Sequence, residues 1–155
     1  MSLWKSATEP LKKKLFWIVS RTALWGYRRL PIFGPLRASL GLIRNADCVL
    51  VIRRNDGRGL CFPGGLSLPW ESDEKTLTRE IKEETGLSCE SFKFAFRYES
   101  GTDIAVRIAV FDVQATGQLR GSWEGTPEWV KIEDVQPDLL PSQKYIVDRL
   151  LGCSQ

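Results

Sequence analysis

Residues 64–87, GGLSLPWESDEKTLTREIKEETGL, decide the fold of this chain. The glycine pair at the start of the stretch lets the backbone approach a ligand without obstruction from a side chain. Ser72 or Asp73 can cap a helix at its N-terminus, and Gly86 can end one. The sequence therefore predicts a glycine bend followed by a helix of about three turns over residues 74–85.

Three glutamates share one face of this predicted helix. With Glu80 as the reference, Glu84 lies at about +40° and Glu83 at about −60° on the helical wheel. Arg79 can offset one negative charge through an i,i+4 contact with Glu83, but it cannot neutralise all three. A divalent cation can, and carboxylate oxygens are the hard ligands that Mg²⁺ and Mn²⁺ prefer. The face is thus either a metal site or an ordinary solvated acidic surface.

The complete spacing of the segment decides between these alternatives. It resembles the Nudix box over residues 65–87: a glycine, five residues, a glutamate, seven residues, and then Arg-Glu-aliphatic-x-Glu-Glu-x-Gly-aliphatic. The matching positions are Gly65, Glu71, Arg79, Glu80, Ile81, Glu83, Glu84, Gly86 and Leu87. Residues 46–151 look like a complete Nudix domain, so the chain is similar to the Nudix hydrolase family.

The resemblance implies an α/β (α+β) fold, with an α/β/α sandwich around a mixed β-sheet. It also implies divalent-metal-dependent hydrolysis of a pyrophosphate bond in a nucleoside diphosphate linked to another group. The substrate would be ADP-ribose or another nucleotide-type molecule, and the metal would be Mg²⁺ or Mn²⁺. Neither the Pro nor the Tyr that marks two Nudix subgroups stands in residues 102–105, so the substrate stays open. The alternative is a catalytically silent Nudix-fold module that binds nucleotides or regulates a partner.

Roles for individual residues follow from the same resemblance. The metal ligands would be the carbonyl of Gly65 and the carboxylates of Glu80, Glu83 and Glu84, while Arg79 would orient the glutamates. A bound Mg²⁺ neutralises phosphate oxygens and lowers the pKa of a bound water, which removes the repulsion that protects a diphosphate from hydroxide.

A carboxylate close to the metal would then accept the proton of the attacking water. In this role the resemblance allows either Glu80 or a loop glutamate, Glu124 or Glu128, and we prefer Glu128. Glu71 is expected to support the loop and the helix electrostatically. For Trp70 and Trp123, packing within their loops is favoured over stacking on a nucleobase.

The rest of the chain alternates strand and helix signals. Strands are expected at Cys48–Ile52, Leu60–Phe62, Phe92–Tyr98, Ile104–Val113 and Trp129–Ile132, and a closing helix capped by Ser142 at residues 142–151. Prolines and glycines punctuate residues 30–45, which therefore read as a linker. The expected division is a basic N-terminal helix and linker over residues 1–45 and a Nudix hydrolase domain over residues 46–155.

The front of the chain is strongly basic. Residues 1–45 hold nine Lys and Arg residues against one acid, Glu9. An amphipathic helix is expected from Thr8 to Arg29, with apolar groups on two faces and no uncharged run long enough to span a membrane. It would pack on the domain or on a second copy in a homodimer, or it would contact a membrane surface through residues 9–29. Sequence-specific nucleic-acid binding is not expected.

The chain has no histidine, which excludes Ser-His-Asp and Cys-His catalysis and a histidine base. Its four cysteines form no C-x-x-C pair, so neither a zinc knuckle nor a redox motif is indicated. Cys48 and Cys61 lie in apolar runs and are expected to be buried free thiols in a reducing cytosol. We therefore expect a cytoplasmic protein, in contact with a membrane surface if the front helix is an anchor.

Overall fold

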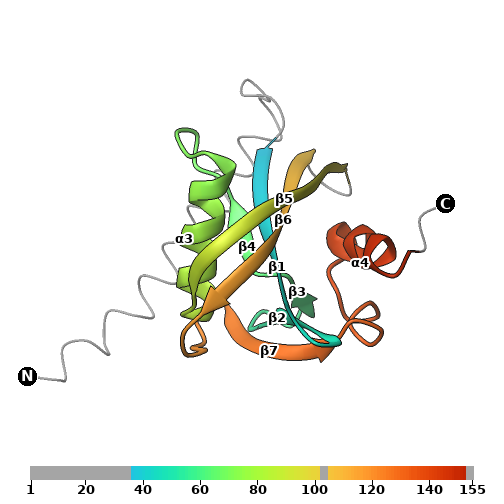
Figure 1. Cartoon of the computed structure of the whole chain (residues 1–155). Coiled ribbons are helices and arrows are strands. Elements are labelled where there is room, and N and C mark those ends of the chain that lie inside the picture. The colour runs from blue at the N-terminus through green and yellow to red at the C-terminus, as the bar shows by residue number, and fades with distance from the viewer. Residues whose placement is uncertain (1–35, 102–104, 153–155) are drawn as a thin grey trace, which may run out of the picture. The chain divides into compact units, whose positions relative to one another are not determined.

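Strand β1 (Leu36–Asn45) lies at the centre of the sheet because it pairs with three other strands. It runs parallel to β6 (Val106–Thr116) and antiparallel to β2 (Cys48–Arg54) and β4 (Gly64–Leu66). The strand order is β3-β2-β1-β6-β5, with β4 paired to β1 and β7 paired to β2. This mixed sheet is seen in the computed structural model, which describes residues 36–101 and 105–152 (Figure 1).

The linker predicted for residues 30–45 is wrong from residue 36 onward, and the described domain begins at Leu36 rather than at residue 46. The segment Ala38–Ile43 is buried throughout, as expected for a strand covered on both faces. Gly41 has a packing role, because a Cβ at this position would lie 2.8 Å from Cδ1 of Ile81. The front helix predicted from Thr8 to Arg29 lies outside the described residues, so its dimer and membrane contacts stay predictions.

Two helices cover opposite faces of the sheet, which confirms the predicted sandwich (Figure 1). Helix α3 (Asp73–Thr85) buries Leu77 and Ile81 completely against one face. Helix α4 (Lys144–Leu150) buries Ile146 and Val147 completely against the other. Strand β1 contributes Ala38, Leu40 and Leu42 to one cluster and Ile43 to the other, so the sheet forms the shared wall of both cores.

The remaining predicted strands are present, with somewhat different ends. They are β3 (Leu60–Cys61), β5 (Ser88–Ser100) and β7 (Gly125–Lys131). The closing segment differs more. It starts with a 3₁₀ turn, η1 (Pro141–Gln143), and the cap predicted at Ser142 is wrong because Gln143 precedes α4 and makes no capping side-chain hydrogen bond.

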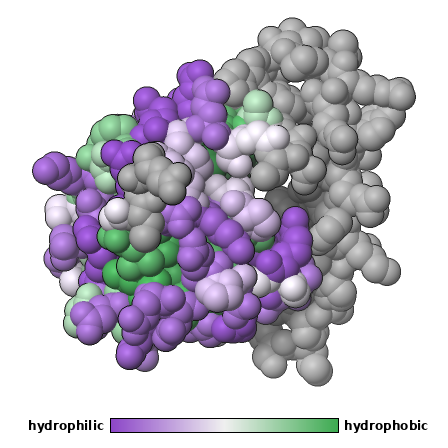
Figure 2. Space-filling view, turned by 90° about the vertical axis from the view of Figure 1, so that its right-hand side faces the viewer, coloured by the Kyte–Doolittle hydropathy of each residue, from purple (hydrophilic) through white to green (hydrophobic). Residues whose placement is uncertain are grey.

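The surface turned to the viewer in Figure 2 is mostly hydrophilic, with hydrophobic side chains gathered in a limited area. Within the part of the chain that the structure describes, none of the helices has the length and apolar character needed to cross a membrane.

Candidate active site

Helix α3 places the acidic face that the sequence predicts. The Ser72 side chain accepts a hydrogen bond from the backbone N–H of Lys75 at 3.3 Å, which caps the first turn. Gly86 ends the helix in the left-handed conformation, with φ of 76°. Because Leu77 and Ile81 fix the rotation of the helix on the sheet, the neighbouring glutamates have a defined direction.

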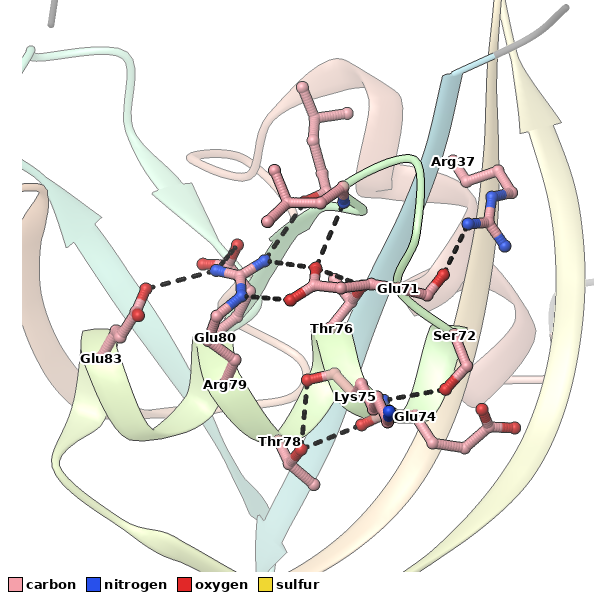
Figure 3. A network of polar contacts seen from close by, with 12 residues as sticks. Arg37, Glu71, Ser72, Glu74, Lys75, Thr76, Thr78, Arg79, Glu80 and Glu83 are labelled. Atoms are coloured by element: carbon pink, nitrogen blue, oxygen red, sulfur yellow. Dashed lines mark hydrogen bonds and ion pairs between the residues drawn. The ribbon is translucent and has the colours of Figure 1, made fainter.

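Arg79 is the centre of a polar network that joins the helix to the preceding loop (Figure 3). Its Nε lies 2.9 Å from Oε1 of Glu71, and its Nη2 lies 3.0 Å from Oε2 of the same carboxylate. Glu71 also accepts hydrogen bonds from the backbone N–H of Leu68 at 3.2 Å and from Oγ1 of Thr76 at 3.1 Å. The Arg79 guanidinium is the main cause that lowers the pKa of Glu71 to about 2. This agrees with the supporting role expected for Glu71.

The same guanidinium holds two of the glutamates on the helix. Its Nη1 lies 2.7 Å from Oε1 of Glu80 and 3.3 Å from Oε2 of Glu83. The predicted i,i+4 contact with Glu83 is therefore present, and the contact with Glu80 is in keeping with the orienting role expected for Arg79. Arg79 thus sets the position of two carboxylates and leaves Glu84 to other partners.

Glu84 is the buried member of the acidic face. Its side chain accepts a hydrogen bond from the backbone N–H of Gly64 at 2.8 Å, and only 5% of the residue is exposed. The pKa of Glu84 is raised to about 8, first by burial and also by the charges of Glu124 and Glu80, against the lowering effect of the hydrogen bond from Gly64. Burial also raises the pKa of Glu80. The site therefore holds negative charge that the protein itself does not fully neutralise.

The glycine bend lies directly against these carboxylates. A Cβ on Gly65 would lie 2.7 Å from both Cδ and Oε1 of Glu80, so a larger residue would push this side chain away. Of the four residues predicted as metal ligands, the structure thus brings Gly65 beside Glu80 and places Glu84 on the adjoining Gly64. Glu83 lies at the rim, with 61% of its side chain exposed.

The two loop glutamates have different surroundings. Glu128 on β7 forms a two-point ion pair with Arg53, with Nε–Oε2 at 3.1 Å and Nη2–Oε1 at 2.6 Å. Glu124 instead acts electrostatically on the helix, because its charge raises the pKa values of Glu80 and Glu84. Its own pKa is raised, first by burial and also by the charge of Glu83. Glu124 is therefore electrostatically coupled to the glutamates of α3, whereas Glu128, the residue preferred from the sequence, is paired with Arg53.

The oxygen atoms of this site are of the type that binds a hard divalent cation. Glu84 is a buried carboxylate for which no ion pair is found among the described residues, and carboxylate and carbonyl oxygens are the usual ligands of Mg²⁺. Across residues 36–101 and 105–152, however, no three Asp, Glu, Cys or His side chains converge on one point. The ion pairs to Arg79 hold Glu80 and Glu83 in their present positions.

Two smaller predictions have different outcomes. The loop packing predicted for Trp70 is wrong, because 77% of this residue is exposed. Trp123 is less exposed, at 44%. Cys61 is buried as predicted, and burial raises its pKa to about 12, so the thiol is unreactive at neutral pH. Cys48 is half-buried and also free.

Comparisons with known proteins agree with this geometry. A family model described as "NUDIX domain" matches residues 34–150. The "Putative 8-oxo-dGTP diphosphatase YtkD" of Bacillus subtilis (strain 168) is 39% identical over 49 residues, which are 32% of this chain. The match spans only 31% of that relative's length.

Solved structures show the same fold. The E. coli ORF135 protein has a TM-score of 0.67 at 19% identity, over 76% of this chain and 89% of that chain. The MutT protein of Methanosarcina mazei Go1 has a TM-score of 0.67 at 24% identity, over 78% of this chain and 96% of that chain.

Proposed function

This chain belongs to the NUDIX domain family, and from that premise we propose that it hydrolyses the pyrophosphate bond of a nucleotide-type substrate with the help of Mg²⁺ or Mn²⁺. One observation carries the proposal. The carboxylates of Glu80 and Glu84 gather at the Gly64–Gly65 bend, where burial raises the pKa of both and the charge of Glu80 adds to the rise at Glu84. Binding of a divalent cation together with the phosphate groups of a substrate would stabilise such a site.

The residues that would hold the metal are Gly65, Glu80, Glu83 and Glu84. A bound divalent cation would neutralise phosphate oxygens and lower the pKa of a coordinated water. Arg79 positions Glu80 and Glu83, and it is itself fixed by both oxygens of Glu71. The network therefore keeps the catalytic helix and the glycine bend in register before the substrate binds.

A proton must leave the attacking water during this reaction. Glu124 is suited to hold that proton on its carboxylate, because a raised pKa brings a carboxylate closer to the working pH. Glu80 and Glu128 are the other candidates. Glu128 is less suited, because both of its carboxylate oxygens accept hydrogen bonds from Arg53.

The substrate is proposed at the level of a class. ADP-ribose and other nucleoside diphosphates linked to a second group fit the chemistry of the site. The name of the Bacillus subtilis relative adds 8-oxo-dGTP, so oxidised and normal nucleoside triphosphates belong in the same test.

The decisive experiment measures phosphate-containing products from a panel of these nucleotides, with Mg²⁺, with Mn²⁺ and with a chelator. Glu84→Gln and Glu83→Gln should lower turnover more than about 100-fold, because each removes a charged metal ligand while keeping the shape of the side chain. Glu133→Gln is the matched control, since this carboxylate pairs with Lys131 at the surface. Equal turnover in the Glu84 variant and the wild type would overturn the metal assignment.

A further inference from the structure

The loop between β4 and α3 presents apolar side chains to solvent. Leu66 is 46% exposed, Leu68 is 41% exposed and Trp70 is 77% exposed, and Pro69 stands between the last two. Single exposed apolar residues are common on protein surfaces, but several along five consecutive positions form a patch of the kind that binds a partner.

Hydrogen bonds at its base hold the loop in this position. The backbone N–H of Ser67 donates to the carbonyl of Arg37 at 2.8 Å, and the backbone N–H of Glu71 donates to the carbonyl of Leu68 at 3.0 Å. Figure 3 shows Glu71 and Arg79 together in the network next to α3. Arg79 reaches the loop through the carbonyl of Leu66 at 3.5 Å. A loop fixed in this way cannot readily fold its apolar side chains onto the domain.

Two partly exposed arginines lie beside the same loop. Arg37 donates a hydrogen bond to the carbonyl of Glu71 at 2.6 Å and remains 40% exposed in its side chain. Arg97 is 46% exposed in its side chain and shares Asp73 with Arg37. Two arginines thus share the one carboxylate of Asp73, which leaves net positive charge there, while the exposed Glu74 and Lys75 offset each other.

The sequence adds more positive charge at this point of the chain. Residues 1–35 contain seven Lys and Arg residues and one acid, together with six aromatic residues, and they join the domain at Leu36, next to Arg37. Basic and aromatic side chains together match an anionic lipid surface, where headgroups attract the cations and the interface accommodates tryptophan.

We propose that the loop Leu66–Trp70 binds the surface of a membrane that contains anionic lipids. Trp70 and the two leucines enter the interface between headgroups and acyl chains, while Arg37, Lys75 and Arg97 face the headgroups. Because the loop continues into Glu71, docking holds the acidic helix close to the lipid surface. This membrane site is independent of the hydrolytic activity and is separate from the contact expected through residues 9–29.

Vesicle co-sedimentation of the full chain tests the proposal. The vesicles are phosphatidylcholine alone and phosphatidylcholine with phosphatidylserine at a ratio of about 3:1, each at low and at high salt. High salt screens the attraction of the basic segment and leaves the apolar contribution of the loop. We expect Trp70→Ser to lower the partition onto the acidic vesicles at high salt by roughly tenfold, because the variant loses a large buried apolar side chain.

Two controls make the outcome specific. Trp129→Ser changes a tryptophan that is 39% exposed on β7, away from the loop, and should bind vesicles like the wild type. Glu84→Gln should also bind like the wild type, so a failed hydrolysis assay would not be mistaken for failed docking. Thermal unfolding of each variant shows that the domain is still folded.

Three results would overturn the proposal. The first is wild-type protein that binds neither kind of vesicle. The second is equal binding of Trp70→Ser and the wild type, which would assign membrane contact to the basic segment alone. The third is a Trp70→Ser variant that binds vesicles like the wild type but has a raised KM for a soluble nucleotide. This result would assign the loop to substrate binding.

Discussion

The guanidinium of Arg79 contacts both carboxylate oxygens of Glu71, with Nε–Oε1 at 2.9 Å and Nη2–Oε2 at 3.0 Å. The pair joins the middle of α3 to the end of the loop that follows the glycine bend. Since the same guanidinium also holds Glu80, the position of the loop and the position of a candidate metal ligand depend on each other. Glu71 can therefore influence catalysis without touching the substrate.

Glu71→Gln should lower turnover by about 100-fold while the metal ligands remain unchanged, because misplacing a reacting group by about 1 Å has an effect of that size. Arg79 would keep its contacts with Glu80 and Glu83 but lose its charged anchor. Steady-state kinetics with Mg²⁺ tests this, and Glu90→Gln on β5 is a suitable control because this exposed side chain accepts a hydrogen bond from Thr116, outside the network of Arg79. Turnover near that of the wild type would show that the loop is positioned without this pair.

The pH dependence of unfolding should also show the contribution of the Glu71–Arg79 pair. The pKa of Glu71 is lowered to about 2 in the folded protein, mainly by Arg79, from an ordinary value of 4.5. A carboxylate with a depressed folded pKa contributes stability above its unfolded pKa and loses it as the pH falls. We expect denaturant titrations to show the wild type losing more stability than Glu71→Gln between about pH 4.5 and pH 2. Parallel curves for the two proteins would contradict this.

The two glycines of the bend should respond differently to alanine. In Gly64→Ala, the new Cβ would lie 2.1 Å from the carbonyl oxygen of Ser39, and φ is 141°, so we expect a loss of about 2 kcal/mol or more in unfolding free energy. In Gly65→Ala, the Cβ meets the movable end of Glu80 at 2.7 Å. That variant should stay folded and lose activity. Thermal unfolding and kinetics of both variants give the comparison, and a stable, active Gly65→Ala would contradict it.

Replacing Glu84 with glutamine should raise the stability of the metal-free protein and lower its activity. The buried carboxylate of Glu84 raises the free energy of the metal-free protein, as its pKa of about 8 indicates. Glu84→Gln removes a group that must take up a proton on folding at neutral pH, and it keeps an oxygen for the N–H of Gly64. We therefore expect about 1–3 kcal/mol of added stability at neutral pH in the presence of a chelator. Denaturant titration with and without Mg²⁺ tests this, because Mg²⁺ should stabilise the wild type and not the variant. A less stable variant would show that the charge is already compensated.

Much of helix α3 could be predicted because its signals are local. Ser72 caps it, Gly86 ends it, and the spacing of Leu77 and Ile81 sets the face that packs on the sheet. Strand β1 could not be predicted in the same way. Gly41 in this strand is a residue type that usually indicates a loop. A glycine is needed there because Ile81, which is distant in the sequence, occupies the space that a side chain would fill.

The site could be predicted as a set of residues but not as a set of contacts. The spacing of the box identifies Glu71, but its partner Arg79 lies eight positions away, beyond the reach of helix periodicity. Glu124 and Glu128 both follow β6, and the sequence does not show which of them faces α3. The pairing of β7 with β2 decides this, because it brings Glu128 to Arg53.

The last prediction compares these two glutamates as the base. Glu124→Gln should lower kcat by roughly 10²- to 10⁴-fold and remove the acidic limb of the pH–rate profile, because a glutamine cannot take the proton of the water. Glu128→Gln should lower kcat much less and leave that limb in place, since both oxygens of Glu128 are already engaged by Arg53. Arg53→Gln controls for the loss of the pair itself. If Glu128→Gln instead removes the acidic limb and Glu124→Gln keeps it, the preference drawn from the sequence stands and the assignment to Glu124 fails.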